Sequence, residues 1–193
     1  APYDDSKNVP EWLVGISYDQ WRDIRFRPDR SLWHGSKSGF EVQFFHPGLF
    51  YDRPVDIHVV DAEGAHPIPF SPGDFDYGAN KFASRVPQEV GFAGFRLHFP
   101  LNKPDYKDEL IAFLGATYFR ALAKQTVYGI SARGLAVDTA LPSGEEFPWF
   151  REFWLVRPSR KAKAAELFAL LDSPRITGAF RFVIHPGTET AVD

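Results

Sequence analysis

Apolar and polar residues alternate with a period of two in several stretches of the chain, beginning near residue 40. Phe40, Val42 and Phe44 alternate with Glu41 and Gln43, which is the pattern of a strand with one buried face. Further strands are predicted at residues 55–59, 92–99, 150–156 and 180–184. The pattern therefore predicts a mainly antiparallel β fold.

Two segments have helical features. Residues 17–24 would form one or two amphipathic turns capped by Ser17, and residues 105–114 are the best helical candidate, behind acidic residues. The residues expected on the buried sides are Trp21 and Ile24 in the first segment and Tyr106, Leu110 and Phe113 in the second. The sequence predicts one or two short helices.

The last third of the chain contains two expected strand pairs. Residues 117–122 and 126–133 are predicted to pair through a turn at 123–125. Residues 160–171 have helical propensity, but turn residues and the alternation at 180–184 follow them. Because propensity is a weak guide, a hairpin is the prediction here.

Composition narrows the class of protein. The 193 residues include 16 Pro and 19 Phe, and turn-rich, aromatic-rich chains favour sandwiches or barrels over helical bundles. A net charge of −3 lacks the basic footprint of a nucleic-acid binder, and no run of apolar residues is long enough to span a membrane. The chain has no Cys, which suits an oxidising compartment, and its six His lack metal-ligand spacing. No metal or cofactor is predicted.

The segment 141–154 combines three carboxylates, one Arg and five aromatic residues. Sugars bind to this combination, because their C–H faces pack on rings and their hydroxyl pairs take bidentate bonds from charged groups. The candidate sugar-binding residues here are Glu145, Glu146, Trp149, Arg151 and Glu152. The alternative is a turn with solvated Glu residues and aromatic residues that fill the core.

A second candidate group is Tyr118, Arg120, Tyr128, Arg133 and Asp138. In a strand, residues two apart share a face, so Tyr118 shares a face with Arg120, and Arg133 shares a face with Ser131. An Arg beside small residues predicts the floor of a groove. Tyr128 is on the opposite strand face from Arg133. The alternative is a salt bridge from Arg120 or Arg133 to Asp138.

The same region carries a family resemblance. The segments that carry it are residues 92–96, 114–120, 127–140, 141–148, 150–154 and 170–175. They resemble signature blocks of the periplasmic glucan biosynthesis proteins G and D, and the similarity runs from about residue 26 to residue 192. Several long blocks in a fixed order make this resemblance specific.

The resemblance implies a fold and a function. Family members act in the Gram-negative periplasm in making osmoregulated glucans with a β-1,2-linked glucose backbone. They have an N-terminal β-sandwich of the galactose-mutarotase-like type, followed by an immunoglobulin-like domain. Residues 1–193 are expected to be the first portion of that sandwich, an incomplete one, without the immunoglobulin-like domain. Some members are similar to β-1,2-glucanases, but their catalytic acids are expected downstream, so no catalytic residue is assigned here.

Three hypotheses remain open. The leading one is a periplasmic glucan-binding portion of a β-1,2-glucan-processing protein. The second is a non-enzymatic glucan-binding or scaffold module that assists a membrane glucan synthase. The third is a structural β domain with only core aromatics. Unpaired strand edges could be covered by a second copy of the chain, so a homodimer is a further expectation.

Overall fold

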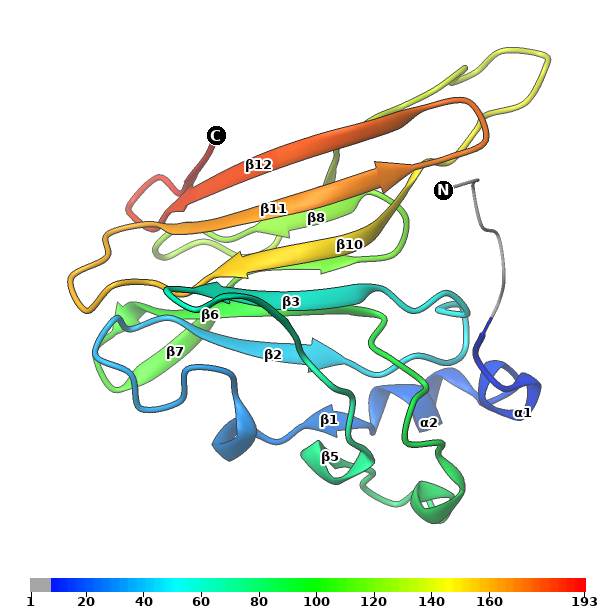
Figure 1. Cartoon of the computed structure of the whole chain (residues 1–193), viewed down its shortest axis with the longest axis horizontal. Coiled ribbons are helices and arrows are strands. Elements are labelled where there is room, and N and C mark those ends of the chain that lie inside the picture. The colour runs from blue at the N-terminus through cyan, green and yellow to red at the C-terminus, as the bar shows by residue number, and fades with distance from the viewer. Residues whose placement is uncertain (1–7) are drawn as a thin grey trace.

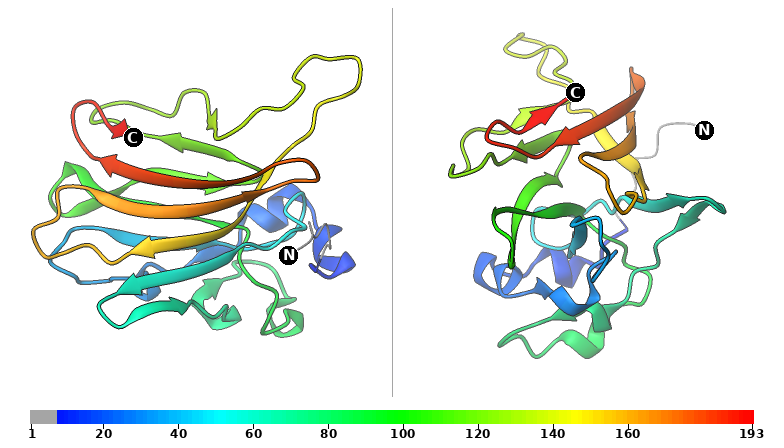
Figure 2. Two further views of the ribbon diagram at one scale, coloured as in Figure 1. Left: turned by 45° about the horizontal axis from the view of Figure 1, so that its top comes forward. Right: turned by 90° about the vertical axis from the view of Figure 1, so that its left-hand side faces the viewer.

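The computed structural model describes residues 8–193, which form two β-sheets packed face to face (Figures 1 and 2). The strand order is β13-β12-β11-β10-β3-β4 in the six-stranded sheet and β2-β6-β7-β8-β9 in the five-stranded sheet, with β1 and β5 paired separately. All pairings are antiparallel except β10 with β3. The described residues therefore form a sandwich.

The helical elements are α1 (Glu11–Val14), α2 (Tyr18–Arg22), η1 (Pro28–Arg30), η2 (Pro72–Asp74) and η3 (Ala83–Arg85). The strands before residue 104 are β1 (Arg25–Phe26), β2 (Glu41–Phe45), β3 (Asp56–Asp61), β4 (Gly64–Pro67), β5 (Phe75–Asp76) and β6 (Gly94–Lys103). The later strands are β7 (Tyr106–Leu114), β8 (Tyr118–Ala121), β9 (Ala132–Arg133), β10 (Trp149–Val156), β11 (Ala165–Asp172), β12 (Thr177–His185) and β13 (Ala191–Val192). Figure 1 shows α1, α2, β1 and β5 gathered beside β2.

Phenylalanine rings join the two sheets. Phe153 of β10 packs edge-on against Phe95 of β6, with ring centroids 5.0 Å apart, and lies 5.5 Å from Phe113 of β7. Phe182 of β12 contacts the rings of Phe113 and Phe119 at 5.2 and 5.4 Å. Edge-to-face pairs of this kind add to the burial of apolar area. The abundant Phe residues are therefore mainly core residues that hold the sandwich closed.

The main fold predictions are confirmed. Residues 8–193 are all-β and mostly antiparallel, with two short α-helices. The hairpin chosen over a helix near residue 170 is β11 paired with β12. Ser17 caps α2 as predicted, through a capping box in which the Gln20 N–H donates to Ser17 Oγ (3.2 Å) and the Ser17 N–H to Gln20 Oε1 (2.9 Å).

The predicted helix at 105–114 is wrong. This segment is the central strand β7, which pairs with β6 on one side and β8 on the other. Leu110, Ile111, Ala112 and Phe113 are all buried, so residues on both faces of the strand are shielded from solvent there. A run buried on both faces loses the period-two pattern of a strand, which is why helical spacing could be read into it.

Two details of the predicted strands also differ. The segment 126–133 pairs with β8 only at β9, and residues 127–131 form a loop with Val127 and Ile130 almost fully exposed. Glu41 and Gln43, expected on a polar strand face, are each only 7% exposed. The Gly35 N–H donates to Glu41 Oε1 (3.2 Å), so the lead-in segment folds back over the outer face of β2.

Candidate functional site

A groove of about 440 Å³ lies on the outer face of the five-stranded sheet. Its lining residues are Tyr18, Trp21, Phe45, Tyr51, Ala112, Leu114, Tyr118, Phe119, Arg120 and Ser131. Six of these residues are aromatic, and one of the six, Phe119, also packs against Phe182 in the core between the sheets. Arg120 is the cation. The groove therefore combines ring surfaces with a guanidinium.

The aromatic wall comes from α2 and from the turn after β2. The Trp21 and Tyr51 rings lie 4.9 Å apart, tilted by 36°. The Trp21 indole N–H donates to the backbone carbonyl of His46 (2.9 Å), which fixes the ring against the sheet. Burial raises the pKa of Tyr51, so its hydroxyl stays protonated at neutral pH and can donate to a ligand.

The floor is built from facing residues of neighbouring strands. Register places Phe45 opposite Gly94 and Gly94 opposite Leu114, so a glycine separates two apolar side chains. Tyr118 lies at the start of the next strand, β8. The Arg96 guanidinium lies over the Phe45 ring, 5.4 Å from the ring centroid. Ala112, Leu114 and Phe45 line the groove on this side.

Arg120 supplies the positive charge of the groove lining. Its guanidinium lies over the Tyr128 ring, 4.5 Å from the centroid, a cation–π arrangement. The Tyr128 hydroxyl donates to Glu109 Oε1 at 2.5 Å and lies 3.0 Å from the Glu109 carbonyl oxygen. This contact links the loop 127–131 to β7.

Arg133 lies beside the groove and is paired. Its guanidinium donates to the Tyr118 hydroxyl (3.4 Å), to Thr139 Oγ1 (3.0 Å) and to the carboxylate of Glu145. The alternative of a bridge from Arg120 or Arg133 to Asp138 is wrong. Asp138 accepts instead from Arg175, at 2.6 Å.

The carboxylates of segment 141–154 do not share one site. Glu146 pairs with Arg175, and hydrogen bonds from Ser173 and Arg175 lower its pKa. Glu152 lies in the other sheet, where its Oε1 is 2.8 Å from His58 Nε2. Glu145 contacts Arg133, as described above. Each carboxylate thus has its own basic partner.

The two remaining predicted residues of this segment also lie apart from the groove. Arg151 donates to Asp172 Oδ2 at 2.9 Å. The Arg53 guanidinium lies over the Trp149 ring, 5.5 Å from the ring centroid. Of the ten predicted sugar-binding residues, Tyr118 and Arg120 line the groove, while Tyr128 and Arg133 contact them.

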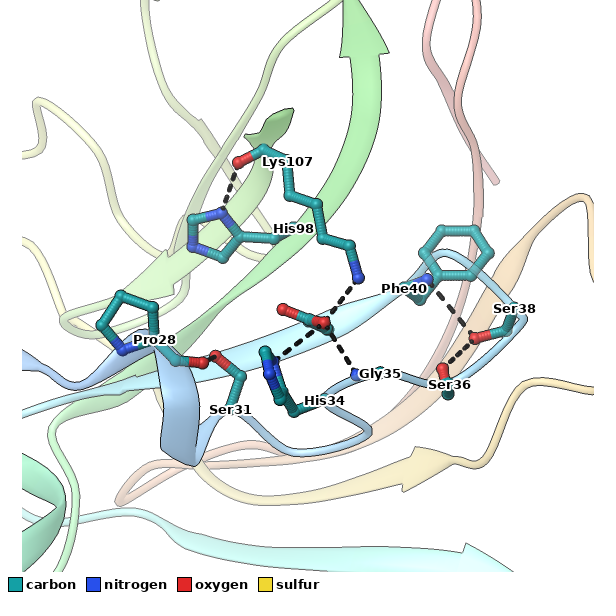
Figure 3. Close-up of polar contacts among 10 residues, drawn as sticks. Pro28, Ser31, His34, Gly35, Ser36, Ser38, Phe40, His98 and Lys107 are labelled. Carbon is teal, nitrogen blue, oxygen red and sulfur yellow. Dashed lines mark hydrogen bonds and ion pairs between the residues drawn. The ribbon is translucent and has the colours of Figure 1, made fainter. Parts of the chain in front are cut away.

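A cluster of polar side chains lies on the same sheet, at the end of β2 and β7 that is away from the groove. Glu41 accepts from Lys107 Nζ (2.5 Å) and from the Gly35 N–H, and lies 3.2 Å from His34 Nδ1 (Figure 3). Burial alone would raise the pKa of Glu41, but the bonds from Lys107 and Gly35 outweigh it and lower the pKa. His98 Nδ1 donates to the Lys107 carbonyl (3.1 Å), so these side chains brace one another.

Sequence reasoning missed the aromatic wall. Tyr18 is 59% exposed. Trp21 packs against the core as predicted, together with Ile24, but it also lines the groove, which the pattern did not indicate. Tyr51 carried no distinguishing pattern. In residues 8–193 no group of three or more His, Asp or Glu side chains could hold a metal ion. No helix in this part of the chain has the length and apolarity needed to cross a bilayer.

Comparison with known proteins gives consistent matches. The family model described as "Periplasmic glucan biosynthesis protein, MdoG" matches residues 1–193. The chain is 55% identical over 185 residues to "Glucans biosynthesis protein G" of Ralstonia nicotianae, covering 96% of this chain and 37% of that protein. It is 47% identical over 188 residues to the protein of that description from Pseudomonas aeruginosa, covering 97% and 36%. The chain thus spans little more than a third of these relatives.

Proposed function

The chain belongs to the periplasmic glucan biosynthesis protein family MdoG, and from this premise we propose that its groove binds the β-1,2-linked glucose backbone of an osmoregulated glucan in the periplasm. The observation that carries the proposal is the combination of Trp21, Tyr51 and Tyr118 with Arg120 in one groove. Aromatic rings accept the C–H faces of glucose, and a guanidinium donates to neighbouring hydroxyls.

The pairing of the carboxylates bears on what happens to the bound glucan. Glycoside hydrolysis needs one carboxylic acid to protonate the leaving oxygen and a second carboxylate across the bond. Glu145, Glu146 and Glu152 each have a separate basic partner. This observation favours a second candidate function for the described residues, a non-enzymatic module that holds glucan for a membrane synthase.

Calorimetric titration with linear β-1,2-glucooligosaccharides tests the proposed binding. We expect weak but saturable binding, reduced about tenfold by Trp21→Ala, which corresponds to about 1.4 kcal/mol. Trp12→Ala is the matched control, because Trp12 is a partly buried tryptophan on α1 that packs against Phe82 instead (5.5 Å). Absence of binding, or equal losses from the two substitutions, would contradict the proposal.

A further inference from the structure

Glu109 is the charged residue at the centre of the outer face of the five-stranded sheet. It lies on β7, and three side chains from three other segments surround its carboxylate. Arg96 of β6 donates to Oε2 at 3.2 Å, Tyr128 donates to Oε1 at 2.5 Å, and Arg120 Nη2 of β8 lies 3.7 Å from Oε1. The carboxylate is 17% exposed, so solvent screens these contacts only in part.

Arg120 has donors available for a ligand. Its side chain is 45% exposed, and it lines the groove. Within residues 8–193 its guanidinium makes the long ion pair to Glu109 and the ring contact to Tyr128, and no hydrogen bond from it is found. Its direction over the groove is therefore set by the Tyr128 ring beneath it and by the Glu109 charge beside it.

Tyr128 needs a tether to support Arg120. It lies in the loop 127–131, where Val127 and Ile130 are 89% and 97% exposed and do not anchor the backbone. The Tyr128 hydroxyl donates to the carboxylate and to the backbone carbonyl of Glu109, and these bonds tie Tyr128 to β7. Burial, together with this bond to a carboxylate, raises the pKa of Tyr128, so the hydroxyl remains a donor at all physiological pH values.

We propose that Glu109 is a positioning residue that tethers the Tyr128 hydroxyl and thereby holds the Arg120 guanidinium over the groove, where it selects glucans with a free vicinal diol. The inference rests on the proposed glucan binding. A β-1,2 linkage leaves the 3- and 4-hydroxyls of each interior glucose free and adjacent, which suits the fork of a guanidinium. A β-1,3 linkage leaves the 2- and 4-hydroxyls as the free hydroxyls on the ring, and these two are not adjacent.

The test is a double-mutant cycle on Glu109→Gln and Tyr128→Phe, titrated with β-1,2- and β-1,3-glucooligosaccharides of equal length. We expect each single substitution to weaken β-1,2 binding about tenfold, as for a lost bond to a charged group. The double variant should lose little more, because residues that act as one unit are not additive. Binding of the β-1,3 series should stay unchanged, which a general loss of structure would not allow.

Glu166→Gln is the matched control, since Glu166 of β11 accepts from Arg181 at 2.6 Å in the other sheet. It should leave both affinities unchanged. Unaltered β-1,2 binding in Glu109→Gln, additive losses, or equal losses in both series would overturn the positioning role while Trp21→Ala still reports a working groove. If the unaltered chain binds no glucan, both the proposed function and this inference are wrong.

Discussion

Gly94 lies against the backbone carbonyl of Phe113, so closely that a Cβ built on Gly94 would lie 2.2 Å from that oxygen. The contact joins β6 to β7 beneath the groove, where Gly94 has a φ of 154°. Real Cβ atoms do not approach a carbonyl oxygen so closely. Only glycine fits at this position without a shift of the strands.

Gly94→Ala should therefore destabilise the fold by about 3 kcal/mol or more, the combined result of a clash and an unfavourable backbone conformation. Chemical denaturation measures this loss. Gly129→Ala is the control, because nothing lies within 4 Å of a Cβ at Gly129, and it should change stability by less than about 0.5 kcal/mol. Equal stability of the two variants would contradict the close approach.

Phe153 is the second position at which stability should be sensitive. It is 2% exposed and contacts Phe95, Phe113 and Phe150. Phe153→Ala would leave a cavity between the two sheets and should cost about 3–5 kcal/mol. Phe168→Ala, at a phenylalanine of β11 that is 39% exposed, should cost less than about 1 kcal/mol. Similar midpoints in urea for the two variants would argue against the Phe-mediated packing of the sheets.

Local signals in the sequence were sufficient where local contacts determine structure. The Ser17 cap depends on a residue three positions away, and the β11–β12 hairpin depends on turn residues between its strands. Strand spacing also placed Tyr118 with Arg120, and both line the groove. In these cases the spacing of apolar residues and the identity of the turn residues are enough to predict the local structure.

The aromatic wall could not be predicted in this way. Trp21 is positioned by the carbonyl of His46, twenty-five residues later, and Tyr51 by a turn that follows β2. The strand β7 was mistaken for a helix because its neighbours β6 and β8, not its own pattern, make it a strand. Tertiary pairing outweighs local propensity in such segments.

His46 should make stability depend on pH. It is buried, its Nδ1 donates to the Pro47 carbonyl (2.6 Å) and its Nε2 faces the Tyr77 hydroxyl (3.1 Å), and burial lowers its pKa to about 4. The pKa in the unfolded chain is about 6.5. Because the folded value is the lower one, the contribution is present in full above pH 6.5 and is lost as the pH falls towards 4.

The loss attributable to His46 should approach about 3 kcal/mol at pH 4, at 1.36 kcal/mol for each pKa unit. Urea titrations between pH 7.5 and 4.5 measure it. His46→Gln should be less stable at pH 7.5 but should show a flatter pH dependence. His185→Gln, at a half-exposed histidine near the C-terminus, should keep the slope of the unaltered chain. A slope unchanged by His46→Gln would refute this assignment.

We expect the 193-residue chain not to catalyse the hydrolysis of β-1,2-glucan. A glycosidase needs a general acid that is protonated at working pH, and environments that supply one raise the pKa of a carboxyl group. The pKa of Glu146 is instead lowered by Ser173 and Arg175. Glu145 is held by Arg133, and Glu152 lies in the other sheet beside His58. These three carboxylates therefore do not face each other across a groove.

Incubation of the purified chain with linear β-1,2-glucan, followed by a reducing-end assay, should give no release above a protein-free blank. Glu152→Gln separates the remaining explanations if release is observed. Release that disappears in Glu152→Gln would mean that this carboxylate is catalytic and that the expectation is wrong. Release that persists unchanged in Glu152→Gln and in Glu145→Gln would exclude both carboxylates as catalytic groups, because a hydrolase that depends on them could not retain its full rate without them.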